Sequence, residues 1–292
     1  MFKIITPEKA GISSKHVLKF IKSLEENHLC THSFIMARGD NIFVEGYYTP
    51  FHKDFNHRMY SISKSFVGIA VGLAIEDGLL RLDDKMVKFF PEYITEDINK
   101  LLLDMTIRDM LTMQTCVASH KKWFYQNLED RIEAYFKAEI TKKPGTSWKY
   151  DSPSTFMLCC IVEKLTGKPF LDYLKDKFLT KAGFSSSSYS LKCPGGHSFG
   201  DSGIICTARD LLVFARFIMN GGKINEVSYM NEEFIKEATK KQVSNSHGGE
   251  HSTGAYGYGY QIWKTPNDGF AFVGMGDQIV ICDPEKDFEG YL

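Results

Sequence analysis

The sequence predicts an α/β fold in which one antiparallel sheet is assembled from strands at both ends of the chain. Strand-like runs of apolar, β-branched and aromatic residues lie near both ends, at 33–38, 41–48, 258–264, 270–275 and 278–282. The stretch between them carries apolar residues at helical spacing. We therefore expect a single domain, 1–292, with a sheet region formed by 1–84 and 241–292 and a mostly helical region formed by 85–240.

The composition limits the classes of protein to consider. With 43% apolar and 13% aromatic residues among 292, the chain can bury a large core. Lys plus Arg total 35 against 36 Asp plus Glu, so the formal net charge of -1 favours neither nucleic acid nor an anionic membrane as a partner. The longest apolar run, Phe66 to Ile75, is too short to cross a bilayer, and the N-terminus lacks the apolar core of a secretion signal. The sequence thus predicts a soluble, cytoplasmic protein and leaves its oligomeric state open.

Each element follows from a local pattern. Apolar residues at i, i+3, i+4 and i+7 predict a helix over 14–27. Gly39-Asp40, between the first two strands, tolerates the positive φ that a tight hairpin turn requires. From Ser61 to about Asp77 the chain is apolar on nearly every helical face, which predicts a buried helix. Further helical patterns lie around 106–113, 127–138, 153–166, 168–181 and 207–220.

The seven cysteines do not indicate a disulfide framework. They form no C-x-x-C pair, and an odd number cannot all pair within one chain. Most have apolar neighbours in the sequence, so we expect reduced core side chains and neither metal ligands nor nucleophiles. They occupy positions 30, 116, 159, 160, 193, 206 and 282.

The strongest candidate for chemistry is Ser61-Ile62-Ser63-Lys64, at the start of the predicted buried helix. Residues three apart share a helical face, so the amine of Lys64 is directed at the hydroxyl of Ser61. A serine hydroxyl is a weak nucleophile until a neighbouring base takes its proton. Burial lowers the pKa of a lysine, which makes the amine a better base near neutral pH. The helix N-terminus also offers unpaired N–H groups that suit an oxyanion.

A purely structural interpretation of the same residues is also open. Ser61 could be a helix N-cap and Lys64 a solvated side chain of the first turn. However, a lysine in the first turn opposes the helix dipole, and here it precedes an almost wholly apolar helix. The placement is unfavourable for stability alone, which favours a functional role. Ser63 and Ser65 have no lysine three residues further on, so Ser61 is the candidate nucleophile.

Several segments spread along the chain match, in order, the motifs of one protein family. They are Ala10-Gly11-Ile12, Arg58 to Phe66, Gly78 to Asp84, Phe90-Pro91-Glu92, Leu111-Thr112-Met113, Pro144 to Ser152, Leu165-Thr166-Gly167 and Thr207 to Leu211. The chain therefore resembles the serine hydrolases of the class C β-lactamase and penicillin-binding-protein type, which include esterases, D-amino-acid peptidases and 6-aminohexanoate-oligomer hydrolases. The resemblance implies a β-lactamase/transpeptidase-like fold.

The resemblance assigns roles to the first two motifs. It makes Ser61 the acylated nucleophile and Lys64 its basic partner. The second motif, a Tyr two residues before Asn or Ser, falls on Tyr150 and Ser152. A phenol near Lys64 could help to deprotonate Ser61 or relay its proton to the leaving group, whereas the structural alternative is a core tyrosine. Ser152 precedes Pro153 and a predicted helix, so it also has the character of an N-cap, and both roles can coexist.

The third motif departs from the commonest family pattern. Where Lys-Thr-Gly or His-x-Gly is usual, this chain has Gly274-Met275-Gly276, with neither lysine nor histidine. It resembles the Gly-x-x-Gly-Gln version of the family's amide and ester hydrolases, in which a main-chain amide, here that of Met275, completes the oxyanion hole. Because a β-lactam or peptide carboxylate lacks its usual cation there, we expect esterase or amidase activity to exceed β-lactamase activity.

Two other sequence patterns are similar to known functional motifs, a protease nucleophile segment and a histidine metal site. Gly200-Asp201-Ser202-Gly203 is similar to the nucleophile segment of trypsin-like proteases, but those enzymes are two β-barrels and this chain is rich in helical patterns. We assign it to the glycine-rich turn that the family has before the helix at Thr207. His247 and His251 lie in a glycine-rich stretch without an H-E-x-x-H helix, so we expect a polar surface loop and no metal site.

The C-terminus is the main anomaly of the resemblance. In the family the last strand is long, lies beside the first strand and is followed by a helix that packs on the sheet. In this chain the C-terminal strand and helix appear truncated, since the sequence closes with Asp287 to Leu292. Losing the seam between the terminal strands would remove hydrogen bonds and buried apolar area together. We therefore expect this seam to be the weak point of the sheet.

Together these features predict a serine hydrolase that cleaves small esters or amides through an acyl-enzyme on Ser61. One alternative is β-lactamase or D-amino-acid peptidase activity, and a second is a non-catalytic penicillin-binding-like protein that binds peptide or cell-wall fragments. We expect a small-molecule ester, amide or β-lactam as substrate, no nucleic-acid or membrane partner, no cofactor and no metal. Aromatic residues that suggest an apolar cleft wall are Trp123, Tyr125, Trp148 and Trp263.

Overall fold

The computed structural model describes residues 2–118, 129–245 and 255–292. Within these ranges, seven strands form one sheet in the order β1-β3-β2-β12-β11-β10-β9. They are β1 (Lys3–Ile4), β2 (Ser33–Arg38), β3 (Asn41–Tyr47), β9 (Trp263–Lys264), β10 (Phe270–Gly274), β11 (Gln278–Asp283) and β12 (Phe288–Tyr291). Every neighbouring pair is antiparallel except β1 with β3 at one edge. The predicted sheet, built from both ends of the chain, is confirmed.

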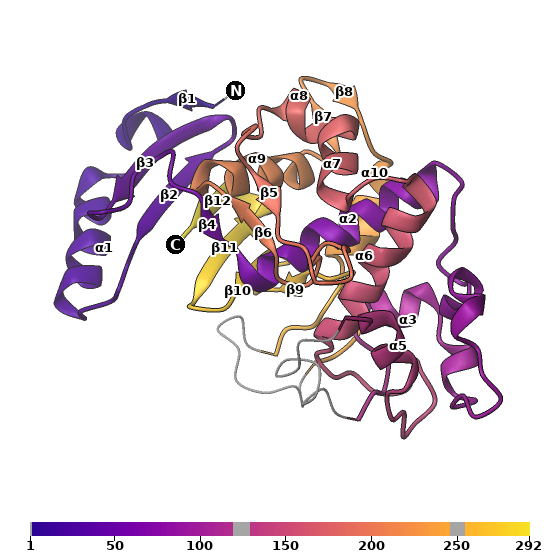
Figure 1. Cartoon of the computed structure of the whole chain (residues 1–292). Coiled ribbons are helices and arrows are strands. Elements are labelled where there is room, and N and C mark those ends of the chain that lie inside the picture. The colour runs from indigo at the N-terminus through magenta and orange to yellow at the C-terminus, as the bar shows by residue number, and fades with distance from the viewer. Residues whose placement is uncertain (1, 119–128, 246–254) are drawn as a thin grey trace.

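Helices fill the space beside and beyond this sheet. They are α1 (Ser14–Glu26), α2 (Ser63–Glu76), α3 (Ile107–Leu111), α5 (Arg131–Phe136), α6 (Ser152–Thr166), α7 (Phe170–Leu174), α8 (Thr180–Ala182), α9 (Ala208–Met219) and α10 (Glu232–Thr239). Figure 1 shows β1 to β3 and α1 at one side of the molecule, α3, α5 and α6 at the other, and β10 to β12 between them. Two smaller sheets, β4 (His57–Arg58) with β6 (Ile204–Cys206) and β5 (Tyr189–Ser190), and β7 (Lys223–Ile224) with β8 (Val227–Ser228), complete the described part.

The two faces of the sheet are covered by helices with matching apolar stripes. The apolar side of α1 packs on β2 and β3, where the rings of Phe20 and Phe34 meet edge to face at 5.6 Å. On the other face α9 contacts β2, β11 and β12. The predicted helices at 14–27 and 207–220 therefore form because each has one apolar stripe and one sheet face to cover.

The helix α2 is buried on nearly every side, as its sequence predicts. All its residues from Ser63 to Ala74 are buried, and it packs against α6, α7 and α10. Glycine permits a close contact with neighbouring backbone, because a Cβ at Gly68 would lie 2.7 Å from the carbonyl oxygen of Tyr260. The helix is preceded by a 3-10 turn, Tyr60–Ile62, so the nucleophile candidate lies just before its first α-helical residue.

The prediction of a strand over 258–264 was wrong for most of its length, since only Trp263 and Lys264 form β9. The reason is local backbone geometry. Gln261 has a φ of +62°, which a strand does not allow, and its N–H donates to the carbonyl of Leu111 in α3. Tertiary hydrogen bonds have therefore overridden the strand propensity of this aromatic segment.

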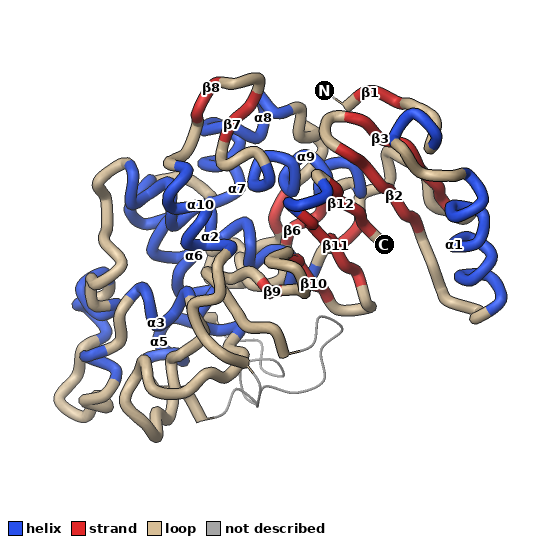
Figure 2. The backbone as a smooth tube through the Cα atoms, turned by 180° about the vertical axis from the view of Figure 1, so that it is seen from behind, coloured by secondary structure: helices blue, strands red, loops and turns tan. Residues whose placement is uncertain are grey.

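The seam between the two ends of the chain is formed by β12. Its four residues pair with β2 on one side and with β11 on the other, and Tyr291 lies opposite both Ile35 and Val280. Figure 2 shows β12 between β2 and β11 with the C-terminus beside them. This strand joins the N-terminal and C-terminal parts of the sheet, although it is only four residues long.

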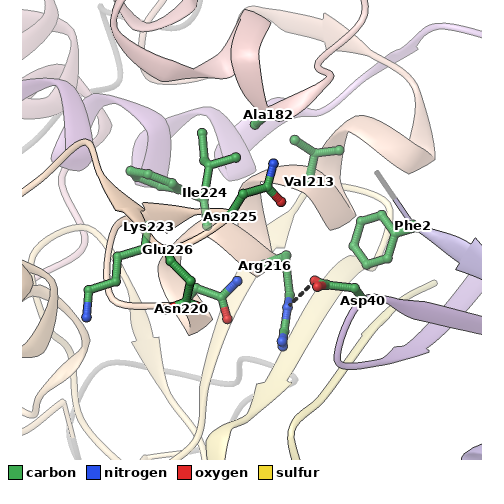
Figure 3. A pocket seen from close by; sticks show the side chains of 11 residues that line it. Phe2, Asp40, Ala182, Val213, Arg216, Asn220, Lys223, Ile224, Asn225 and Glu226 are labelled. Carbon is green, nitrogen blue, oxygen red and sulfur yellow. Dashed lines mark hydrogen bonds and ion pairs between the residues drawn. The ribbon is translucent and has the colours of Figure 1, made fainter.

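A buried carboxyl group lies at this seam. Glu289 is fully buried, and neither of its carboxylate oxygens has a hydrogen-bond partner among the described residues. The closest cation is Arg216 on α9, whose Nη1 lies 3.7 Å from Glu289 Oε2 and which also pairs with Asp40 and Asp287. Figure 3 shows Arg216 reaching toward Asp40 at the edge of a 340 Å³ cavity. Burial raises the pKa of Glu289 to about 8, against the opposing effect of Arg216.

Glu289 makes the stability of the sheet depend on pH. The pKa of Glu289 is raised from 4.5 to about 8 in the folded chain. Between these two pH values the carboxyl group is therefore protonated in the folded chain and ionised in the unfolded chain. We predict that this group lowers the free energy of unfolding by up to about 1.4 kcal/mol per pH unit as the pH rises through the window. Urea unfolding between pH 5 and 9 should show that Glu289→Gln removes this slope.

Glu45→Gln is the control, because Glu45 lies on the same sheet but forms a bidentate ion pair with Arg209 at 2.6 Å. This variant should be less stable at neutral pH and should keep the slope. An unchanged slope in Glu289→Gln would contradict the assignment.

Candidate active site

Ser61 and Lys64 lie side by side at the start of α2. Lys64 Nζ is 3.1 Å from Ser61 Oγ, as the i, i+3 spacing predicts. The Lys64 side chain is 1% exposed, whereas Ser61 is partly exposed. The residue before the nucleophile, Tyr60, has a φ of +45°, an uncommon conformation for a non-glycine residue that often occurs at functional sites. The structural alternative for Lys64, a solvated side chain, is wrong.

The second partner of Lys64 comes from a segment far away in the sequence. Lys64 Nζ donates to the backbone carbonyl of Asp201 at 2.6 Å. The same segment is fixed to the turn before Ser61, because Arg58 Nε donates to the carbonyl of Ser202 at 3.1 Å. The segment 200–203 therefore forms one wall of the candidate site through its backbone, a role that the sequence pattern alone did not indicate.

Tyr150 faces the same amine. Lys64 Nζ lies 5.2 Å from the centroid of its ring. The ring is held by two aromatic neighbours: it stacks on Trp263 at 5.5 Å and meets Tyr258 edge to face at 6.5 Å. Two segments distant in sequence thus bring a hydroxyl and an amine beside a phenol ring, and a third segment packs against that ring.

The residue after Tyr150 anchors its backbone. Asp151 is buried; its Oδ1 accepts from the N–H of Ser154, and its other carboxylate oxygen accepts from the hydroxyl of Thr115. Asp151 is therefore the N-cap of α6, and Ser152 is the first residue of that helix. The expected N-cap at Ser152 was one residue too late, and Pro153 still occupies the first turn.

Behind the site, one buried amide links three helices. Gln261 is 1% exposed, and its Nε2 donates to the carbonyls of Met110 and Leu111 in α3. Its Oε1 accepts from Thr155 of α6 at 2.6 Å, while its carbonyl accepts from Ser65 of α2 at 2.8 Å. These bonds hold the helix that carries Lys64 and the helix that follows Tyr150 at a fixed separation.

The third motif approaches the nucleophile along β10. A Cβ at Gly274 would lie 2.6 Å from the carbonyl oxygen of Met59, two residues before Ser61. Met275 is 70% exposed at the β10–β11 turn, and Gly276 there has a φ of +82°. Gln278 ties this turn to the turn before Ser61 by donating from Nε2 to the carbonyl of Arg58 at 3.0 Å. The glycine motif therefore lies directly against the start of the nucleophile turn.

A cavity of about 630 Å³ opens at this junction. Tyr60 and Met275, the neighbours of the nucleophile and of Gly276, are among its lining residues. Arg58 also lines it, with its guanidinium 4.7 Å from the centroid of the Tyr60 ring. Arg58 is a cation near the third motif that no local pattern in the sequence indicates, because more than 200 residues separate it from Met275. Further lining residues are Leu29, Cys30, Thr31, His32, Ser33, His57, Asp277, Gln278, Tyr291 and Leu292.

The remaining expectations fall partly outside the described residues. His247, His251, Trp123 and Tyr125 belong to the ranges that are not described. Among the described residues no cluster of three His, Cys, Asp or Glu side chains could hold a metal ion. In the same part of the chain, none of the helices has the length and apolar character needed to span a bilayer. The seven cysteines are free thiols, and only Cys30 is exposed.

Comparisons with known proteins agree with this architecture. The Beta-lactamase family model matches residues 20–289. A 6-aminohexanoate-dimer hydrolase of Paenarthrobacter ureafaciens is 26% identical over 283 residues, covering 90% of this chain and 72% of that protein. A lovastatin esterase of Penicillium rubens is 25% identical over 177 residues, which is 52% of this chain and 44% of that protein.

A solved structure extends the likeness to the fold. The octameric penicillin-binding protein homologue from Pyrococcus abyssi superposes with a TM-score of 0.76, covering 95% of this chain and 72% of that one, at 18% identity. The fold and the juxtaposed serine, lysine and tyrosine define a β-lactamase-like architecture. The chain belongs to the Beta-lactamase family, whose members are serine hydrolases.

The contact at Gly274 yields a test of the site geometry. In Gly274→Ala, the new methyl group would displace β10 from the carbonyl of Met59 and hence from the start of the nucleophile turn. We predict that kcat for a small ester falls on the order of 10²-fold, the effect of a displacement of about 1 Å. Steady-state kinetics check this prediction.

Gly290→Ala is a matched control in the same sheet, because its nearest contact is the flexible edge of the Phe288 ring at 3.1 Å. It should retain most of its activity. Equal activity losses in the two variants would show that the effect is general destabilisation of the sheet.

Proposed function

We propose that this protein is a serine hydrolase that cleaves small esters or amides through an acyl-enzyme on Ser61. The observation that carries the proposal is the 3.1 Å contact between Ser61 Oγ and the buried amine of Lys64, with the ring of Tyr150 beside it. A nucleophile within hydrogen-bond distance of a base, which is in turn oriented by a third group, is the arrangement that activates serine.

The acylation step uses these three residues together. Ser61 Oγ forms a bond to the carbonyl carbon of the substrate while its proton moves to the neutral amine of Lys64 or, through that amine, to the phenolate of Tyr150. The proton then passes to the departing alcohol or amine as the bond to the leaving group breaks. Water attacks the acyl-Ser61 ester in the second half-reaction, with the same groups accepting its proton.

The oxyanion of the tetrahedral intermediate is bound by backbone amides in this mechanism. The amide of Ser61, at the start of α2, supplies one donor, and the amide of Met275 supplies the other. The packing of Gly274 against Met59 supports this assignment, because it holds the β10–β11 turn against the nucleophile turn. In this proposal Ser152 and Gly276 contact the substrate, which is the role that the family resemblance implies for the second and third motifs.

The substrate class is supported by the third motif and by the relatives. No lysine or histidine stands at Gly274-Met275-Gly276. Arg58 lies near this turn, but its Nε already donates to the carbonyl of Ser202. Two of the similar proteins are named as a 6-aminohexanoate-dimer hydrolase and a lovastatin esterase. Small esters and amides therefore fit better than carboxylate-bearing β-lactams.

This substrate class predicts a clear kinetic preference. The kcat/KM for a short-chain p-nitrophenyl ester should exceed that for a chromogenic cephalosporin by on the order of 10²-fold, since the carboxylate of the cephalosporin lacks a dedicated cation. Higher kcat/KM for the cephalosporin would refute the preference. Release of one equivalent of nitrophenol without turnover would instead identify a non-catalytic binding protein.

The proposed proton path predicts that Lys64 and Tyr150 act as a unit. Lys64→Ala and Tyr150→Phe should each lower kcat by on the order of 10²-fold or more, as expected for loss of a general base. The double variant should lose far less than the product of the two effects, because one proton path cannot be removed twice. Single-turnover acylation rates for the four proteins provide the measurement.

Tyr258→Phe is the control for the loss of a phenol, because Tyr258 contacts the Tyr150 ring but is fully buried beside it. It should keep near-normal kcat. Additive losses in the double variant, or normal turnover in Tyr150→Phe across neutral pH, would remove Tyr150 from the proton path.

A further inference from the structure

A second charged side chain is buried beside the candidate base. Asp201 is 3% exposed, and its Oδ1 has no hydrogen-bond partner among the described residues. Its backbone carbonyl accepts from Lys64 Nζ at 2.6 Å, so the residue that orients the amine also carries a carboxyl group nearby. A buried polar atom without a partner is costly, which favours a role beyond stability.

The position of Asp201 is fixed by close packing on both sides. A Cβ at Gly200 would lie 2.4 Å from Cβ of Cys159 in α6, and a Cβ at Gly203 would lie 2.7 Å from the carbonyl of Phe199. Arg58 also holds the carbonyl of Ser202. These contacts hold the segment 200–203 between α6 and the turn before Ser61. They therefore keep Asp201 close to Lys64.

Charged and titratable groups from α2, α5, β4 and α6 surround Asp201. Lys64 of α2, Arg131 of α5 and Arg58 of β4 are the cations that act on its carboxyl group. From α6, Cys159 and Cys160 face it as thiols, and Glu163 of the same helix is paired with His197. Burial raises the pKa of Asp201, and Lys64 is the strongest of the groups that oppose this rise.

We propose that Asp201 is the positioning residue for Lys64: its carbonyl holds the amine toward Ser61, and its carboxylate stabilises the ammonium that Lys64 becomes during acylation. This inference rests on the proposed function and adds a fourth residue to Ser61, Lys64 and Tyr150. Its role corresponds to that of the group that orients the base in other nucleophile–base pairs.

The proton balance of the step is simple. Ser61 loses its proton to Lys64 as Oγ bonds to the carbonyl carbon, and Lys64 becomes positively charged. Asp201 gains no proton; its negative charge lowers the energy of the new ammonium, because both side chains are buried. When the proton leaves Lys64 for the leaving group, the original charges are restored.

This role determines the sign of the pH effect. An ionised carboxyl group near Lys64 stabilises the ammonium form of the amine, whereas a neutral amide at the same position does not. Asp201→Asn should therefore shift the midpoint of the acylation rate profile toward acid by on the order of one unit. The weaker base should also lower the limiting rate several-fold. At acid pH, where Asp201 is itself protonated, the two profiles should converge.

The experiment measures the second-order rate of Ser61 acylation by p-nitrophenyl acetate between pH 5 and 10, with rates normalised to the labelled fraction from intact-mass analysis. Asp201→Ser, a smaller neutral replacement, provides the same readout if the asparagine variant folds poorly. Asp210→Asn is the control, because Asp210 is equally buried at 2% exposure but caps α9 and accepts from the N–H of Thr207. It should reduce thermal stability and leave the midpoint unchanged.

A midpoint shifted toward acid in Asp201→Asn or Asp201→Ser, but not in Asp210→Asn, supports the proposal. An unchanged midpoint with Ser61 still acylated overturns it and leaves the proposed function intact. A wild-type protein in which Ser61 is not acylated overturns both.

Discussion

The amine of Lys64 has to be buried for the site to exist, and much of the structure follows from that constraint. A primary amine that is 1% exposed must be hydrogen-bonded, because an unsatisfied buried donor costs on the order of 1–3 kcal/mol or more when charged. Among the described residues its hydrogen-bond partners are Ser61, in the turn before its own helix, and the carbonyl of Asp201, 137 residues away. The fold must therefore bring segment 200–203 to the start of α2 and hold it there.

The topology provides this arrangement by joining the two ends of the chain. The sheet closes through β12, which places the β10–β11 turn beside the turn that carries Ser61. The inserted helical region then adds α6, whose cap at Asp151 fixes Tyr150, and Gln261 ties α2, α3 and α6 together behind the site. Catalytic geometry in this architecture depends on contacts between elements that are distant in the sequence. Local changes at Gln261 should consequently affect activity as well as stability.

Sequence patterns predicted the elements whose apolar period is strong. The helix predicted over 14–27 is α1, Ser14–Glu26, and the strands predicted over 33–38 and 41–48 are β2 and β3. The Ser61–Lys64 contact was also predictable, because i, i+3 geometry depends only on the helix. In contrast, the contacts of Asp201 and Arg58 arise from tertiary packing and leave no periodic signal. Gln261 was predicted as part of a strand, although its amide bonds to α3 require a positive φ.

The central claim is that Ser61, and no other serine, is activated as a nucleophile. Intact-mass analysis after incubation with a fluorophosphonate, followed by peptide mapping, tests this claim most directly. We predict a single adduct on Ser61 that is absent from Ser61→Ala, because within 2–118, 129–245 and 255–292 only the turn before α2 combines a serine hydroxyl with a buried amine 3.1 Å away. An adduct on Ser202, or one that persists in Ser61→Ala, would contradict the account.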